Sequence, residues 1–241
     1  MHIDSGGTAV KASYSHGIST YLQPTYFLDG DNLAVIAYAY SCIEGRETPV
    51  EKAVALFYAV RDQIKYDPYR IDLTREKFRA SVVLSKKFGF CVEKAMLLAA
   101  TARVVGIPSR LRFADVRNHL TTKRLKEIMK TDIFFFHGYT ELFLNDIWVK
   151  ATPTFNLSLC DRFGIRPLDF DGIHDSIFHE FDRGGNRHME YIHDHGPFAD
   201  LPYEELKATF EKHYAIYLRE EKTGSYVDFE REAEEEKVTI V

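Results

Sequence analysis

The stretch "GFCVEKAMLLAATARVVGIPSR", from Gly89 to Arg110, predicts a helix that begins at a cysteine. Its apolar residues recur at helical spacing and form one stripe: Val92, Ala95, Met96, Ala99, Ala102 and Val105. Gly106 is suited to end the helix, and Pro108 prevents its continuation. We therefore expect about four turns, mostly buried, with Cys91 in the first turn.

Cys91 has two interpretations. At a helix start, unpaired backbone amides and the positive end of the helix dipole stabilise a thiolate, which favours a nucleophile. The small Gly89 just before it is expected to let a substrate backbone approach. A cytosolic cysteine is more commonly a small buried hydrophobe. A nucleophilic role therefore requires a base elsewhere in the chain.

The stretch "DIFFFHGYTELFLNDIWVKATPTFN" is the strongest hairpin signal in the chain. Two β-rich runs meet at Asn145-Asp146, a dipeptide suited to a tight turn. Taking these two residues as the loop fixes the register: Leu144 opposite Ile147, Phe143 opposite Trp148, Glu141 opposite Lys150, and Tyr139 opposite Thr152. We expect the third of these pairs to form a cross-strand ion pair.

His137 lies on the first strand of this hairpin, and the alternation of side chains makes Thr152 its diagonal neighbour on the same face. A lone histidine on a strand is more often structural than catalytic. The presence of a cysteine at a helix start changes that balance, and His137 becomes the candidate base for Cys91.

The two segments together resemble the core of the transglutaminase-like superfamily, in the bacterial branch described as candidate cysteine proteases. The resemblance spans about residues 50–156 and includes "VRDQIKYDP", while the later "LDFDG" and "RHMEY" look like the C-terminal part of that branch. It implies an α+β, papain-like fold in which the nucleophile helix packs against an antiparallel β-sheet that carries the histidine.

The resemblance also implies roles for residues. Cys91 matches the nucleophile and His137 the general base of an acyl transfer or hydrolysis that passes through a thioester. The Cys91 backbone amide would hold the oxyanion, with Tyr66 as a candidate second donor. Hydrolysis is favoured over cross-linking because water is always available. No cofactor or metal is implied.

The third catalytic position departs from the family pattern. Members usually carry Asp just before the Pro-Thr of the second hairpin strand, whereas this sequence has Thr152 in "ATPT". A hydroxyl does not stabilise an imidazolium as a carboxylate does. Three residues are candidates for the missing role: Thr152, Asn156 and Asp171. The alternative is a catalytically weakened protein that binds peptides or protein partners in the same cleft.

Composition limits the partners. The chain has 31 basic and 36 acidic residues, with the basic ones dispersed, so nucleic acid is not an expected partner. No window is apolar enough to span a membrane. Three cysteines without a CxxC pair argue against a disulfide framework or a zinc knuckle and favour a reducing cytoplasm. We expect a peptide, protein or small amide as substrate; the oligomeric state is left open.

The remaining segments predict a single domain over residues 1–241. Residues 157–241 are expected to form a turn-rich cover that ends in an amphipathic helix, and residues 1–18 to be mobile or to hold an edge strand. The acidic run "EREAEEEK" is typical of a solvated helix face or a frayed tail. The C-terminal third also holds His174, His179, His188, His193 and His195. Their spacing matches no established zinc site, and we expect surface or hydrogen-bonded histidines.

Overall fold

The computed structural model describes residues 17–119, 122–178, 189–215, 218 and 228–236. Its helices are η1 (Thr20–Leu22), α2 (Leu33–Cys42), α3 (Pro49–Gln63), η2 (Arg75–Phe78), α4 (Ala80–Lys86), α5 (Cys91–Val104), α6 (Lys123–Met129), α7 (Leu157–Phe163), α8 (Tyr203–His213) and α10 (Phe229–Glu236). Its strands are β1 (Lys65–Tyr66), β2 (Phe88–Gly89), β3 (Ser109–Asn118), β4 (Ile133–Leu144), β5 (Ile147–Ala151) and β6 (Met189–Phe198).

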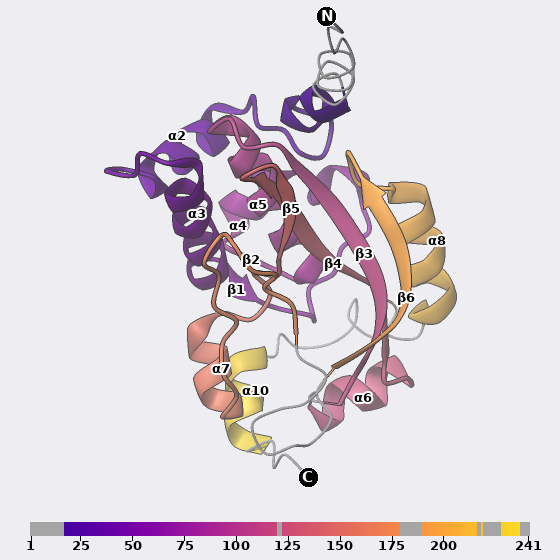
Figure 1. Cartoon of the computed structure of the whole chain (residues 1–241). Helices are drawn as coiled ribbons and strands as arrows, with labels where there is room; N and C mark the ends of the chain where they lie inside the picture. The colour runs from indigo at the N-terminus through magenta and orange to yellow at the C-terminus, as the bar shows by residue number, and fades with distance from the viewer. Residues whose placement is uncertain (1–16, 120–121, 179–188, 216–217, 219–227, 237–241) are drawn as a thin grey trace, which may run out of the picture.

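An antiparallel sheet with the strand order β5-β4-β3-β6 forms one layer of the fold. Helices α4 and α5 lie behind this sheet in Figure 1, and α8 lies behind its β6 edge. The short strands β1 and β2 pair in parallel as a separate two-stranded sheet. This arrangement is the α+β fold that the sequence predicts, with the cysteine helix packed against an antiparallel sheet.

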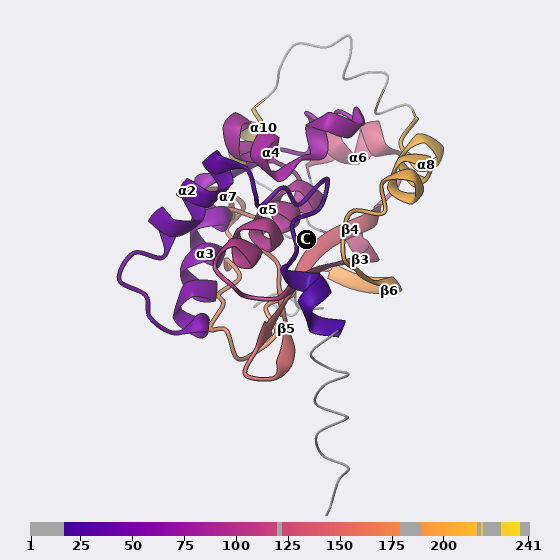
Figure 2. The same cartoon turned by 90° about the horizontal axis from the view of Figure 1, so that it is seen from above.

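Helix α5 is the centre of the hydrophobic core. Every residue from Cys91 to Arg103 is buried, because α2, α3 and α4 surround the faces that the sheet does not cover (Figure 2). The helix begins at the predicted cysteine and is followed by Gly106, whose φ of 81° lies in the left-handed region where glycine is favoured. Thr140 on β4 donates a 2.8 Å hydrogen bond to the Ala95 carbonyl, which joins the sheet directly to the helix.

The predicted hairpin register is confirmed. Strand β4 pairs with β5 so that Leu144 lies opposite Ile147, Phe143 opposite Trp148 and Glu141 opposite Lys150. Asn145 and Asp146 have φ values of 49° and 66°. Two successive residues with positive φ are typical of the tight turn whose twist matches that of a hairpin, and Asn and Asp tolerate that conformation.

The predicted ion pair between the two strands is wrong, although its register is right. The Glu141 carboxylate accepts hydrogen bonds from Arg110 at 2.5 Å and from Arg112 at 3.1 Å. Lys150 instead approaches Asp175 at 3.5 Å. The two arginines come from β3, on the other side of β4, and supply planar guanidinium groups that suit a carboxylate.

The segment before α8 differs from its prediction. Residues 189–198, expected to be part of a turn-rich cover, form the ten-residue strand β6 at the edge of the sheet, paired with β3. Pairing with a strand far away in the sequence overrides the Gly and Pro signals there, and the two register shifts in the pair accommodate them.

The C-terminal helices dock on the core. In α8, Leu206 and Phe210 are buried as predicted, as is Tyr214 just beyond its end, while the expected contact of Tyr217 lies outside the described residues. The acidic run forms a solvated face only in part: Arg231, Glu234 and Glu235 of α10 are exposed, whereas Glu230 and Glu232 are only 6% and 8% exposed. The expectation for residues 1–18 falls almost wholly outside the described chain. No helix in the described ranges is both long and apolar enough to cross a membrane.

Candidate active site

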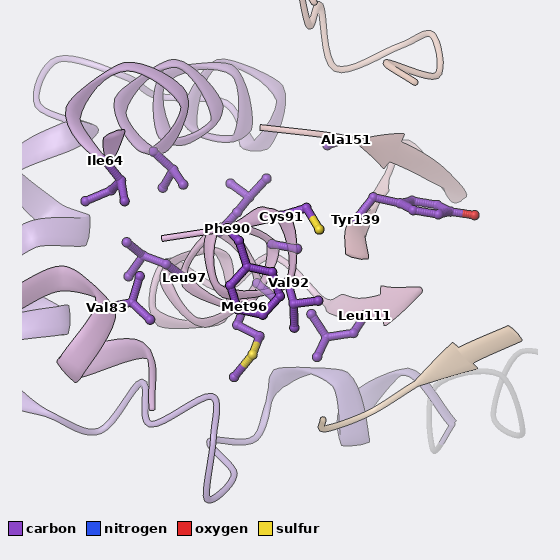
Figure 3. Packing of buried hydrophobic residues seen from close by; sticks show 14 of the residues in the cluster. Ile64, Val83, Phe90, Cys91, Val92, Met96, Leu97, Leu111, Tyr139 and Ala151 are labelled. Atoms are coloured by element: carbon purple, nitrogen blue, oxygen red, sulfur yellow. The ribbon is translucent and has the colours of Figure 1, made fainter. Parts of the chain in front are cut away.

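Cys91 opens helix α5 with its side chain almost fully buried; the residue is 7% exposed. Burial raises the pKa of its thiol to about 11. Three backbone amides, those of Gly138, Val92 and Cys91 itself, act in the opposite direction because they donate to the thiolate. Figure 3 shows the sulfur projecting from the helix on the side of the strand that carries Tyr139.

Gly138 explains how the strand comes so close to the cysteine turn. A Cβ added at this position would lie 2.8 Å from the Cα of Val92, so a side chain would push the strand away from the helix. Strand β5 ends at Ala151, opposite Thr140, and therefore does not extend as far as Gly138. The Gly138 amide faces the Cys91 sulfur instead.

His137 precedes Gly138 on β4 and is 4% exposed. Because side chains alternate along a strand, its imidazole lies on the face opposite the one where Gly138 meets α5. The ring centroid lies 5.8 Å from that of Phe178. Burial lowers the pKa of the imidazole to about 4. Among the described residues, its Nε2 atom has no hydrogen-bond partner.

The two pKa shifts define the resting state of the site. The thiol is a weaker acid than an ordinary cysteine, and the imidazole is a weaker base than an ordinary histidine. Both changes favour the uncharged forms, because moving a charge out of water into this interior is unfavourable. Cys91 and His137 are therefore a neutral thiol and a neutral imidazole at pH 7, and not a thiolate and an imidazolium.

A cavity of about 40 Å³ adjoins the cysteine. Its walls combine the start of α5 with β4, α6 and α8, and its lining residues are Tyr66, Pro68, Ile71, Phe90, Cys91, Leu125, Met129, Phe134, Phe135, Phe210 and Tyr214. No charged side chain is among them. Tyr66, which the sequence suggests as an oxyanion donor, is therefore in the same cavity wall as Cys91, and burial keeps its phenol protonated by raising its pKa well above the usual value.

Part of the chain resembles a known protein family. Residues 36–153 match the family model of the transglutaminase-like superfamily. The segment that holds Cys91 and His137 is therefore similar to the core of that superfamily.

Two solved structures resemble the chain at low identity. One is described as "a putative cysteine protease" from Cytophaga hutchinsonii, with 18% identity and a TM-score of 0.45 over 57% of this chain and 42% of that protein. The other is "a putative protease" from Parabacteroides distasonis, with 15% identity and a TM-score of 0.39 over 59% of this chain and 27% of that protein. The chain thus spans less than half the length of either protein. No curated protein matches it.

Thr152, at the third position of the family pattern, makes no side-chain hydrogen bond to the histidine. The Thr152 hydroxyl is buried and, like Nε2 of His137, has no hydrogen-bond partner among the described residues. The two atoms therefore do not bond to each other, even though the hairpin register places them on the same face. Thr152 is held through its backbone amide, which donates to the Ser176 carbonyl at 3.0 Å.

The other two candidates for the third position are engaged elsewhere. The Asn156 side chain accepts from the Tyr66 amide at 2.9 Å and donates to Glu230 at 2.7 Å. It therefore ties β1 to α10. Asp171 accepts a 2.7 Å hydrogen bond from His174 in an exposed loop, and this bond is the main reason that the pKa of its carboxyl falls to about 2.

Sequence reasoning missed Glu93, which positions the cysteine turn. Its carboxylate accepts from the Phe90 amide at 3.2 Å and pairs with Lys86 at 2.5 Å while being almost fully buried. A Cβ at Gly89 would lie 2.8 Å from this carboxylate. The absence of a side chain at Gly89 therefore leaves room for Glu93 beside the start of α5. A glutamate two residues after the cysteine was the available signal, because it occupies the third position of the helix.

The C-terminal histidines do not gather at the site. His174 pairs with Asp171, and His195 pairs with Asp115 at 2.8 Å. The ring of His193 meets that of His195 edge-on at 4.7 Å. His179 and His188 lie outside the described residues. In the part of the chain that the structure describes, no group of three or more His, Cys, Asp or Glu residues is arranged to hold a metal ion.

Proposed function

We propose that this protein is a cysteine-dependent hydrolase or acyltransferase that acts on amide or ester carbonyls, with Cys91 as nucleophile and His137 as general base. The observation that carries the proposal is the setting of the sulfur. It lies at the start of a buried helix, faces three backbone amides, and forms part of a cavity wall beside the strand that bears the histidine.

The reaction begins from the neutral pair. As the sulfur attacks the carbonyl carbon, the imidazole of His137 takes the thiol proton across the edge of β4 that β5 leaves open at Gly138, so the charges develop only in the transition state. The carbonyl π bond opens to an oxyanion, held by the Cys91 amide with the Tyr66 hydroxyl as second donor. The oxyanion then collapses and expels the amine or alcohol, which receives the proton from His137. The product is a thioester, and attack by water releases the acid and restores the thiol.

A binding protein is the second candidate function. It is favoured by the third position, where a hydroxyl replaces the carboxylate that would stabilise an imidazolium. It is also favoured by Nε2 of His137, which has no hydrogen-bond partner in the described part of the chain. In that case the same cavity would hold part of a peptide or protein partner without chemistry.

Acylation by p-nitrophenyl acetate separates the two functions, because this ester is activated and needs little recognition. The full chain would be treated with the ester, quenched in acid, and digested for mass spectrometry to locate acetyl groups. We expect an acetyl thioester on Cys91, absent in Cys91→Ser. We expect His137→Ala to slow its formation by about 100-fold or more, as loss of a general base does.

Cys160 provides the matched control. It is also buried, with the pKa of its thiol raised by burial to about 12, but it does not line the cavity. Cys160→Ser should therefore leave acylation of Cys91 unchanged. Acetylation of Cys91 that is no faster than that of the more exposed Cys42, or that is insensitive to His137→Ala, would exclude the enzyme and leave the binding protein.

A further inference from the structure

We propose that the cavity beside Cys91 selects a small apolar group next to the reacting carbonyl, so that the substrate class is an amide or ester of an acid with a short aliphatic side chain. This inference rests on the proposed function, because it treats Cys91 as the residue that attacks. It goes further by naming what the cavity accepts and what it rejects.

The chemistry of the cavity walls supports this choice. Four elements supply aliphatic or aromatic side chains, among them Leu125 and Met129 from α6 and Phe210 from α8. None of the described side chains that line the cavity bears a charge. A substrate group that carries a charge would lose its water there without gaining a charged partner, which is unfavourable. A carboxamide would also have few groups with which to replace its hydrogen bonds to water.

The two tyrosines in the walls do not alter this conclusion. The Tyr214 hydroxyl accepts a hydrogen bond from the Phe135 amide at 2.6 Å and donates one to the Ile133 carbonyl at 3.2 Å. Its donor is therefore used by the β4 backbone and does not serve a substrate. Tyr66 lies beside the sulfur, where its hydroxyl can serve the substrate carbonyl. The polar atoms near Cys91, namely Tyr66 and the backbone amides, are thus suited to the carbonyl, and the rest of the cavity to its neighbour.

The cavity that adjoins Cys91 is small. A volume of about 40 Å³ exceeds the space that one water needs and is far smaller than a cleft for a drug-sized ligand. A branched side chain of three carbons matches this space better than a long or aromatic one. Valine and threonine side chains have this shape and differ only in that a methyl group is replaced by a hydroxyl.

This difference gives the test. Acylation of Cys91 would be measured with the p-nitrophenyl esters of N-acetyl-valine, N-acetyl-threonine and N-acetyl-aspartate, each rate divided by that of uncatalysed hydrolysis. We expect the valine ester to acylate Cys91 on the order of 10 to 100 times faster than the threonine ester, as apolar pockets discriminate such pairs. The aspartate ester should be slower still.

Variants of α6 locate the selectivity. Met129 lines the cavity, whereas its neighbour Ile128 is a partly buried residue that does not. Met129→Gln introduces a polar group of similar length and should reduce the preference for valine over threonine at least threefold, while Ile128→Gln should leave it unchanged. If Met129→Gln does not fold, the rates of the three esters with the unaltered protein still show whether an apolar group is preferred.

The outcomes separate this inference from the proposed function. If Cys91 forms a thioester with all three esters at similar normalised rates, or fastest with threonine or aspartate, the inference is overturned while the function stands. If none of the esters, nor p-nitrophenyl acetate, acylates Cys91, the function fails and the inference fails with it. A valine preference that Met129→Gln and Ile128→Gln change equally would contradict the placement in this cavity.

Discussion

At the scale of single residues, the site is governed by burial more than by specific pairing. The Cys91 thiol is held near three amides that favour its thiolate, yet desolvation outweighs them and keeps the proton on sulfur. The imidazole of His137 is buried, its Nε2 has no hydrogen-bond partner among the described residues, and desolvation keeps it neutral. In catalysis at such a pair, the negative and positive charges would form only while the substrate reacts.

The buried imidazole makes stability depend on pH. The pKa of His137 falls from 6.5 to about 4 in the folded protein, so the unfolded chain binds the proton more readily. Its contribution is therefore fully present above pH 6.5 and is lost as pH falls toward 4. At pH 5 the loss should be about 2 kcal/mol. Urea unfolding at pH 7 and pH 5 should show this loss in the native protein and not in His137→Gln.

All other residues are the same in both proteins, so their contributions cancel in the comparison. An equal decrease in the free energy of unfolding for the native protein and for His137→Gln would show that the imidazole is accessible to water and can be protonated without cost.

At the scale of elements, the site depends on the contact between α5 and β4. Gly138 allows the backbone of the strand to touch the first turn of the helix, and Glu93 holds that turn by accepting from the Phe90 amide. Both contacts involve the backbone around Cys91. They therefore set the position of Cys91 independently of its own side chain.

Gly138→Ala tests this contact. The added methyl group would meet the backbone of Val92, which cannot rotate away, so helix and strand must separate. We expect a loss of about 1–3 kcal/mol in the free energy of unfolding, as for overpacking in a core, measured by urea unfolding. Acylation of Cys91 should slow as well, because the Gly138 amide moves from the sulfur.

Gly17→Ala is the control, because a Cβ placed there would meet no described atom within 4 Å beyond its chain neighbours and its own helix backbone. It should change the free energy of unfolding by less than about 1 kcal/mol. The interpretation of the α5–β4 contact would be abandoned if the two alanine variants were equally stable.

At the scale of the whole molecule, the C-terminal helix α10 binds segments that are far apart in the sequence. The ring of Phe229 contacts those of Tyr66, Tyr69 and Phe163 at centroid distances of 5.5 to 5.8 Å. Glu232 accepts a 2.6 Å hydrogen bond from Tyr69. Because Tyr66 also lines the cavity at Cys91, α10 supports one wall of the candidate site from behind.

Phe229→Ala should therefore destabilise the fold as a core truncation does. The side chain is 4% exposed, and its removal leaves a gap among three aromatic rings. We expect a loss of about 3–5 kcal/mol in the free energy of unfolding, measured with urea. Leu33→Ala is the contrasting variant, because Leu33 is 82% exposed and should change stability by less than about 0.5 kcal/mol. Similar small effects for both would show that α10 is not docked in solution.

The sequence by itself determined the features that depend on neighbours along the chain. Helical spacing and the glycine after Val105 defined α5 with Cys91 at its start, and the dipeptide Asn145-Asp146 fixed the hairpin register. Only the tertiary structure decided which distant groups meet. Glu141 bonds arginines of β3, Asn156 bonds Glu230 of α10, and residues 189–198 become a strand because β3 lies beside them. The physical reason is that local preferences are short-ranged, whereas a buried polar group takes whichever partner the packing brings within about 3 Å.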